Sequence, residues 1–313
     1  MLSFLRLLTG ALALGGASAL TNPFNRKILL TNDDGWAASH IRASYTALKA
    51  AKYNVLMSAP AENKSGTGSS MAPPTVLNIT CEFDTCPIGA PPEGFNASDP
   101  RLNYVNSFPA TSVEFGIQTL SPKFFKSKPD FVFAGPNVGN NLGPTVLISG
   151  TVGAATEAAL EGVPAIAFSG ATGAQISYTT LANTTDPLTV ASNLYAALSV
   201  KVVDTLLLLP GPILPKGIAL NVNYPSTTSA QNCTQVSDFK FVLTRINPPD
   251  ANSADVPICG STQLPTESDA IATLGACINT ISVFNASTKA DVDKETQTFV
   301  LLRLFEILSC LPK

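Results

Sequence analysis

Charged side chains are scarce in this sequence. The 313 residues include 19 Lys and Arg and 22 Asp and Glu, or 13% of the chain, about half the usual share of roughly 25%. With a hydrophobic fraction of 45%, this composition excludes a solvated, disordered chain and favours a large folded core. A net charge of −3 without any run of Lys or Arg excludes polynucleotide binding by electrostatic attraction.

Histidine is nearly absent, since His40 is the only one. A zinc site built from several histidines is therefore excluded, and a Ser-His-Asp triad has a single candidate. We expect His40 to be a helix-surface or packing residue rather than a catalytic group.

The sequence has no CxxC pair, although it contains six cysteines: Cys81, Cys86, Cys233, Cys259, Cys277 and Cys310. In an exported chain, an even number of cysteines favours disulfides over metal ligation. Cys81 and Cys86 are expected to pair locally. The spacing leaves the connections among the other four open.

The N-terminus has the pattern of a secretory signal peptide. Arg6 precedes the apolar run 7–14, and the small residues Ala17 and Ala19 fit a cleavage site after residue 19. A membrane anchor is the alternative, but the run is shorter than the roughly 20 residues that span a bilayer, and prolines interrupt the later apolar runs. We therefore predict a secreted protein without a membrane partner. N-glycosylation sequons occur at Asn63, Asn78, Asn96, Asn183, Asn232 and Asn285.

Strand-like and helical patterns alternate from residue 27 onward. Short apolar runs predict strands and helical spacing predicts helices. The predicted strands cover 27–31, 53–59, 130–134, 165–169 and 217–222, and the predicted helices cover 38–51, 109–120, 149–160 and 188–203. Such alternation is typical of an α/β fold with a mostly parallel sheet covered by helices on both faces.

Two stretches depart from the alternation. Residues 61–107 are rich in proline and loops and are expected to form an excursion from the core. Residues 226–313 contain short strands such as 239–245 and a closing helix at about 291–310. We therefore divide the chain into a signal peptide, residues 1–19, an α/β core, residues 20–225, and a β-rich extension whose helix packs on the core, residues 226–313.

The first chemically unusual loop follows the first predicted strand. Asp33 and Asp34 are adjacent carboxylates at a strand end, followed by Gly35 and a helix. One such aspartate is readily explained as a helix cap beside a turn glycine. A second aspartate adds repulsion unless a cation lies between them, so the pair favours a metal site.

Two further strand-end loops are rich in glycine, hydroxyl and amide groups. The glycines and hydroxyls of residues 59–70 suit a phosphate-binding loop, but the segment matches neither the Walker pattern nor GxGxxG, and composition alone favours a flexible connection. Residues 131–156 contain no charged side chain and lead into a helix. Neutral donors beside a helix N-terminus suit a phosphate, whereas the alternative is a glycine-rich connection. Oxygen ligands from the three loops select Mg²⁺ or Mn²⁺ over zinc.

At these loops the sequence resembles the SurE survival-protein family of metal-dependent nucleotidases, particularly its secreted fungal acid-phosphatase-like members. The resemblance runs from residue 27 to about 169 and continues more weakly in 219–225 and 267–287. The matching motifs are Thr31-Asn-Asp-Asp-Gly35, Asn63-Lys-Ser-Gly66, Gly135-x-Asn-x-Gly-x-Asn-x-Gly143 and Ser149-Gly-Thr-Val152. His40 stands where the family usually has glycine, and the proline-rich excursion replaces segments of the bacterial members.

The resemblance implies a Rossmann-like three-layer core whose C-terminal β extension takes part in dimerisation, so a homodimer is one expected assembly. It also implies that one divalent cation, Mg²⁺ or Mn²⁺, is held by Asp33, Asp34, Ser65 and Asn137. The implied activity is hydrolysis of phosphate monoesters, especially nucleoside 5′- and 3′-monophosphates, so the expected partner is a small-molecule phosphate ester.

On this basis we expect the cation to bind a phosphoryl oxygen and to activate a water for in-line attack. Asp33 and Asp34 are the predicted catalytic residues, and Asn141, Ser149 and Thr151 are predicted to hydrogen-bond the phosphoryl oxygens. Two alternatives stay open. One is a phosphatase in which an aspartate is itself phosphorylated, and the other is a secreted nucleotide- or phosphate-binding protein without turnover.

Overall fold

The computed structural model describes residues 25–227, 233–250 and 253–312. The predicted signal peptide and the sequon at Asn232 lie outside the described residues. Within the described part, nine strands form one sheet in the order β3-β4-β2-β1-β5-β6-β7-β9-β8. Their bounds are β1 Lys27–Thr31, β2 Asn54–Pro60, β3 Glu93–Asn96, β4 Asp99–Val105, β5 Phe131–Val138, β6 Ala165–Gly170, β7 Ile218–Tyr224, β8 Phe239–Thr244 and β9 Cys277–Asn285.

The sheet is mainly parallel. Strands β4, β2, β1, β5, β6 and β7 run in one direction, whereas β3 pairs antiparallel with β4 and β9 pairs antiparallel with β7. The central strands are buried on both faces because their residues are almost all apolar, as in Ile28, Leu29 and Leu30 of β1. The predicted α/β class is confirmed.

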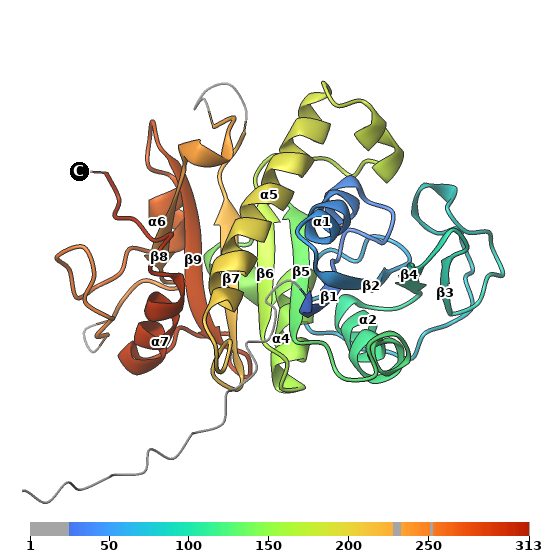
Figure 1. The fold of residues 1–313 in the computed structure, drawn as a ribbon, viewed down its shortest axis with the longest axis horizontal. Helices are drawn as coiled ribbons and strands as arrows, with labels where there is room; N and C mark the ends of the chain where they lie inside the picture. The colour runs from blue at the N-terminus through green and yellow to red at the C-terminus, as the bar shows by residue number, and fades with distance from the viewer. Residues whose placement is uncertain (1–24, 228–232, 251–252, 313) are drawn as a thin grey trace, which may run out of the picture.

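Helices cover both faces of the sheet (Figure 1). Helices α1, α5 and α7 bury their apolar side chains in one core cluster, and α2 and α4 bury theirs in a second cluster on the opposite face. The helices are α1 Ser39–Ala50, α2 Pro109–Phe115, α3 Ser121–Phe125, α4 Gly150–Leu160, α5 Pro187–Leu208, α6 Glu267–Ile271 and α7 Lys294–Leu304. The result is the three-layer core expected from the alternation.

Helix α5 is long and apolar enough to cross a membrane by length and composition alone, contrary to our expectation that no later segment would be. Most of its apolar residues are buried in the core cluster that it shares with α1 (Figure 1). It begins with Asp186, whose side chain accepts hydrogen bonds from the backbone N–H groups of Leu188 and Thr189. This burial identifies α5 as a core helix of the described fold.

The excursion 61–107 is loop-rich, but it also contributes two strands to the sheet. Strand β4 pairs in parallel with β2 from Met57–Leu102 to Pro60–Val105. The sheet likewise continues past the expected core boundary at residue 225, because β9 and β8 extend it beyond β7. The closing helix, Lys294–Leu304, is shorter than the predicted 291–310.

All six cysteines are paired. The expected local disulfide joins Cys81 and Cys86. The other two, which spacing left open, join Cys233 to Cys277 and Cys259 to Cys310. These two disulfides join cysteines that are 44 and 51 residues apart in the sequence. All four cysteines belong to the extension, so the two bonds stabilise it internally.

Candidate functional site

The acid pair lies where the strand order of the sheet reverses. From β1 the chain builds outward through β2 and β4 on one side, and through β5, β6 and β7 on the other. Thr31 at the end of β1 is paired with Ala134 of β5, so Asp33 and Asp34 emerge beside the Gly135–Val138 end of β5. In open α/β sheets, ligands bind in the crevice at such a point.

Asp33 is buried beneath the N-terminus of α4. The Thr151 hydroxyl donates a hydrogen bond to Asp33 Oδ1, and Gly150 packs so closely that a Cβ there would lie 2.8 Å from the Asp33 Cβ. Burial raises the pKa of Asp33, against the opposing effect of the Thr151 hydrogen bond. The helix N-terminus and the hydroxyl therefore hold a carboxylate that is removed from water.

Asp34 is also buried and is fixed from two other loops. Gln175 Nε2 donates to Asp34 Oδ1 at 2.5 Å, and the Val138 N–H donates to Asp34 Oδ2 at 2.9 Å. Burial raises the pKa of Asp34 well above its ordinary value, and the neighbouring Asp33 charge adds to this effect. Two adjacent buried carboxylates that disfavour each other's charge form a site that a cation would stabilise.

Asn137 and Ser65 complete the predicted ligand set. Asn137 Nδ2 donates to the backbone oxygens of Val138 and Gly139, and these bonds leave its amide oxygen available as a ligand. Ser65 is exposed, and its hydroxyl donates to Asn63 Oδ1 at 2.7 Å. The preceding backbone N–H, that of Lys64, donates to the Asp33 carbonyl at 2.7 Å, which attaches this loop to the acid pair.

This donor set fits a hard divalent cation. It offers two carboxylates, an amide oxygen and a hydroxyl, which are ligands typical of Mg²⁺ and Mn²⁺. Among the described residues, no group of three or more His, Cys, Asp and Glu side chains is placed to hold a metal ion. Any cation at the acid pair thus relies on the neutral oxygens of Ser65 and Asn137 as well.

The three predicted phosphate-binding side chains all have partners within the protein. The Ser149 hydroxyl caps α4 by accepting from the Val152 N–H, and Thr151 donates to Asp33. Asn141 Nδ2 donates to Ser169 Oγ at 2.8 Å. The structure therefore assigns Thr151 a contact with the acid pair, while hydrogen bonding of these three residues to a phosphoryl group stays a prediction.

A buried polar network formed by β7 and Glu267 holds the loop that contains Asn141. Asn223 Oδ1 accepts the Asn141 N–H at 2.8 Å, and Asn221 Nδ2 donates to the Asn141 carbonyl at 2.8 Å. Glu267 accepts the Gly143 N–H at 2.7 Å and also contacts Asn221 and Ser282. Burial raises the Glu267 pKa to about 7. The extension thus fixes the third loop of the core.

Sequence reasoning did not identify Gln175, Asn221, Asn223 or Glu267 as parts of this region. Gln175 lies in the loop after β6, so the rule that pointed to the other strand-end loops would have found it. Asn221 and Asn223 are two residues apart in a buried strand. Buried amides need hydrogen-bond partners, so two of them on one face of a strand indicate a polar network. Glu267 begins the weaker resemblance at 267–287, but that resemblance gave it no role, and its partners Gly143 and Asn221 lie far away in the sequence.

His40 is buried among aromatic and small residues of α1 and its neighbours. Its ring lies 5.8 Å from that of Tyr195, and neither ring nitrogen has a hydrogen-bond partner in the described structure. The expected packing role is confirmed. Burial lowers the pKa of His40 to about 4, so the folded protein holds the ring neutral.

We expect this histidine to make the fold sensitive to acid. Between pH 6.5 and 4 the unfolded chain binds a proton at His40 that the folded chain does not, so stability falls as pH falls through this window. The loss reaches about 3 kcal/mol, since each pKa unit is worth 1.36 kcal/mol. Urea unfolding of the native protein and of His40→Leu at pH 7 and 4.5 measures it. A stability difference between the two that is the same at both pH values would contradict this account.

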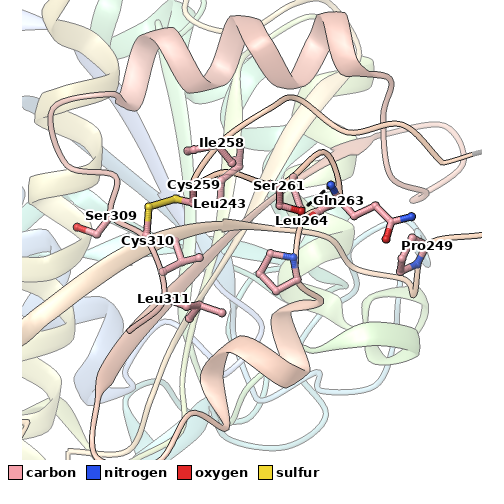
Figure 2. Close-up of a pocket in the computed structure, with 12 residues that line it drawn as sticks. Leu243, Pro249, Ile258, Cys259, Ser261, Gln263, Leu264, Ser309, Cys310 and Leu311 are labelled. Atoms are coloured by element: carbon pink, nitrogen blue, oxygen red, sulfur yellow. Dashed lines mark hydrogen bonds between the residues drawn. A yellow bond between two sulfur atoms is a disulfide. The ribbon is translucent and has the colours of Figure 1, made fainter. Parts of the chain in front are cut away.

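Figure 2 shows a cavity in the C-terminal extension. It has a volume of about 500 Å³ and is lined by residues of β8, the segment around Ile258–Pro265 and the C-terminal segment, beside the Cys259–Cys310 disulfide. Strand β8 is five positions from β1 in the sheet, or about 24 Å at the usual strand spacing. This cavity is therefore separate from the acid pair.

Fold and site together define a Rossmann-like α/β protein with an oxygen-rich acidic site at the switch point of its sheet. The chain belongs to the SurE family, because the family model described as "Survival protein SurE" matches residues 28–247. That match contains every predicted site residue.

Two relatives carry names that refer to phosphate chemistry. An acid phosphatase of Yarrowia lipolytica is 40% identical over 225 residues, which cover 70% of this chain and 62% of the relative. A 5′-nucleotidase SurE of Lawsonia intracellularis is 34% identical over 199 residues, which cover 64% of this chain and 66% of the relative. The matched region thus spans slightly less than two thirds of each relative's own length.

A solved structure shares the fold. The SurE protein from Aquifex aeolicus superposes with a TM-score of 0.57 at 23% identity, covering 88% of this chain and 98% of that one. At this identity the likeness concerns the fold, and it supports the expected SurE-like architecture.

Proposed function

We propose that this protein hydrolyses phosphate monoesters with the help of one divalent cation, Mg²⁺ or Mn²⁺. The observation that carries the proposal is the pair of buried carboxylates, Asp33 and Asp34, at the sheet's switch point beside the uncharged loop 135–143 and the N-terminus of α4. The names of the related acid phosphatase and 5′-nucleotidase support it, and nucleoside 5′- and 3′-monophosphates are the proposed substrates.

In this proposal Asp33, Asp34, Ser65 and Asn137 hold the cation, which supplies positive charge to the phosphoryl group and lowers the pKa of water. The protein contributes fixed geometry. Thr151 orients Asp33, whereas Gln175 and the Val138 N–H orient Asp34. Since each carboxylate is already positioned before substrate binds, little reorganisation is needed when charge develops on the phosphoryl oxygens.

The uncharged loop and the helix N-terminus are proposed to bind the phosphoryl oxygens. Backbone N–H groups at the start of α4 and the predicted side chains of Asn141 and Ser149 are neutral donors, and the helix dipole favours an anion at this end. The single hydroxyl proton of Thr151, the third predicted residue, is donated to Asp33. Since residues 131–156 carry no charge, the cation is the main positive group available to the substrate from this part of the site.

We further propose secretion through the N-terminal signal pattern. Three disulfides within the described residues are consistent with folding in an oxidising compartment. The homodimer implied by the family resemblance stays a prediction.

Phosphate release from p-nitrophenyl phosphate and from mononucleotides tests the proposal. We expect a chelator to lower turnover at least tenfold and added Mg²⁺ or Mn²⁺ to restore it, because the acid pair needs a cation to act on an anionic substrate. Equal turnover with and without chelator would remove the metal from the proposal. Cation-dependent nucleotide binding without phosphate release over hours would instead favour a binding protein, and a trapped phospho-aspartate would favour the covalent alternative.

A further inference from the structure

A cavity of about 260 Å³ lies next to the acid pair and has no role in the chemistry described so far. Its lining includes Glu62, Lys64, Pro73, Thr75, Asn106 and Phe108. The volume is below the roughly 300–1,000 Å³ of pockets that enclose a whole ligand. It therefore suits one portion of a substrate whose remainder lies elsewhere.

Two segments that line the cavity lie close to Asp33. On one side, the Lys64 N–H donates to the Asp33 carbonyl at 2.7 Å. On the other side, Phe108 is followed by Pro109, and a Cβ on Gly150 would lie 3.1 Å from Pro109 Cγ and 3.0 Å from Asp33 Oδ2. The cavity is therefore lined by segments that contact or closely approach Asp33.

The cavity wall is held in place by hydrogen bonds. Ser107 Oγ donates to the Ala72 carbonyl at 2.6 Å, and Thr111 Oγ1 accepts the Ala72 N–H at 3.2 Å. Asn106 Nδ2 donates to the Thr75 carbonyl at 2.8 Å. These contacts fix residues 72–75 of the excursion against the segment that leads into α2, so the space exists before a ligand binds.

The chemistry of the lining selects an uncharged, planar group. Lys64 is the one cation among the described residues that line the cavity, and its Nζ lies 3.6 Å from Glu62 Oε2. No unpaired positive charge is thus left there for a second phosphate. Phe108 is half-buried and is the one aromatic residue among the described residues that line the cavity, and nucleobases and other aromatic groups stack on aromatic side chains.

We propose that this cavity is the leaving-group subsite of the enzyme and that Phe108 selects phosphate monoesters with a planar aromatic leaving group over aliphatic esters and polyphosphates. The inference rests on the proposed phosphomonoesterase function, because it assumes that the phosphoryl group lies at Asp33 and Asp34. The excursion 61–107 then has a role in substrate choice.

Comparison of adenosine 5′-monophosphate with glycerol 3-phosphate tests the subsite in the full-length, cation-loaded protein. We expect Phe108→Ala to lower the ratio of kcat/KM for the nucleotide over the glycerol ester at least tenfold, mainly through KM for the nucleotide, whereas Phe108→Tyr retains the ratio because it keeps the ring. Phe95→Ala, which removes an aromatic side chain 55% exposed elsewhere in the excursion, is the matched control and should leave the ratio unchanged.

An unchanged ratio in Phe108→Ala, or native turnover of glycerol 3-phosphate without turnover of the nucleotide, would overturn the subsite and leave the phosphomonoesterase function standing. Absence of turnover with both esters would overturn the proposed function instead. In that case calorimetric titration with the nucleotide decides the subsite, since Phe108→Ala must weaken binding at least fivefold while Phe95→Ala does not. Equal affinities would refute it.

Discussion

Replacing Asp33 by asparagine is expected to lower kcat for phosphate-ester hydrolysis at least a hundredfold, equivalent to about 3 kcal/mol of transition-state stabilisation. Asparagine has nearly the same shape and can still accept the hydrogen bond from Thr151. What it removes is one of the two negative charges that the proposed cation requires. Steady-state kinetics with p-nitrophenyl phosphate at saturating Mg²⁺ or Mn²⁺ measures the effect.

The same substitution should not destabilise the cation-free protein. Burial raises the pKa of Asp33, and its charge also raises the pKa of Asp34, so the ionised pair opposes folding at neutral pH unless a cation is bound. We expect an unchanged or higher Tm for Asp33→Asn without metal. We also expect Mn²⁺ to raise the Tm of the native protein and not that of the variant.

Asp130→Asn provides the control for this prediction. Asp130 lies at the opposite end of β5, where its carboxylate accepts the Lys27 N–H at 2.8 Å, so the variant should retain both kcat and the Mn²⁺-induced increase in Tm. Near-native turnover of Asp33→Asn would remove the acid pair from the mechanism.

The parts of the fold that could be predicted from sequence are those set by local pattern. Apolar runs such as Lys27–Thr31 and helical spacing such as Ser39–Ala50 correspond to elements of the structure because a strand buried on both faces and an amphipathic helix each impose a recognisable order of residues. The contribution of β4 was missed, since its pairing with β2 is made 45 residues away in the chain, as Met57 with Leu102, and its own sequence is interrupted by proline and asparagine.

The site was predictable to the same extent. Asp33 and Asp34 follow β1 and Asn137 lies at the carboxyl end of β5, and parallel strands bring their carboxyl ends to one edge of a sheet. The partners that orient these side chains were not predictable in the same way. Thr151 was expected to face the substrate, yet it donates to Asp33, because Gly150 lets the start of α4 approach the aspartate closely. Such contacts depend on how tightly two segments pack, which no local pattern reports.

Gly153→Ala is expected to lower kcat/KM by about two orders of magnitude, although the residue contacts neither the acid pair nor the proposed substrate. Gly153 lies in the first turns of α4, and a Cβ there would overlap the backbone carbonyl of Gly68. The Gly68 N–H donates to the Ile148 carbonyl at 2.9 Å, so this contact docks the loop that carries Ser65. Displacement of a positioning group by about 1 Å can cost about a hundredfold in rate.

The direction of the stability change in Gly153→Ala distinguishes steric overlap with Gly68 from the ordinary effect of alanine on helix stability. Alanine in place of glycine within a helix ordinarily stabilises it by about 1 kcal/mol. Here we expect a loss of about 1–3 kcal/mol, typical of overpacking, because the obstructing atom belongs to a backbone and cannot rotate away. Glu157→Ala, one turn further along α4, should keep native kcat/KM and Tm. If Gly153→Ala instead raised Tm and retained full activity, the close contact between α4 and the Ser65 loop would have no part in positioning the site.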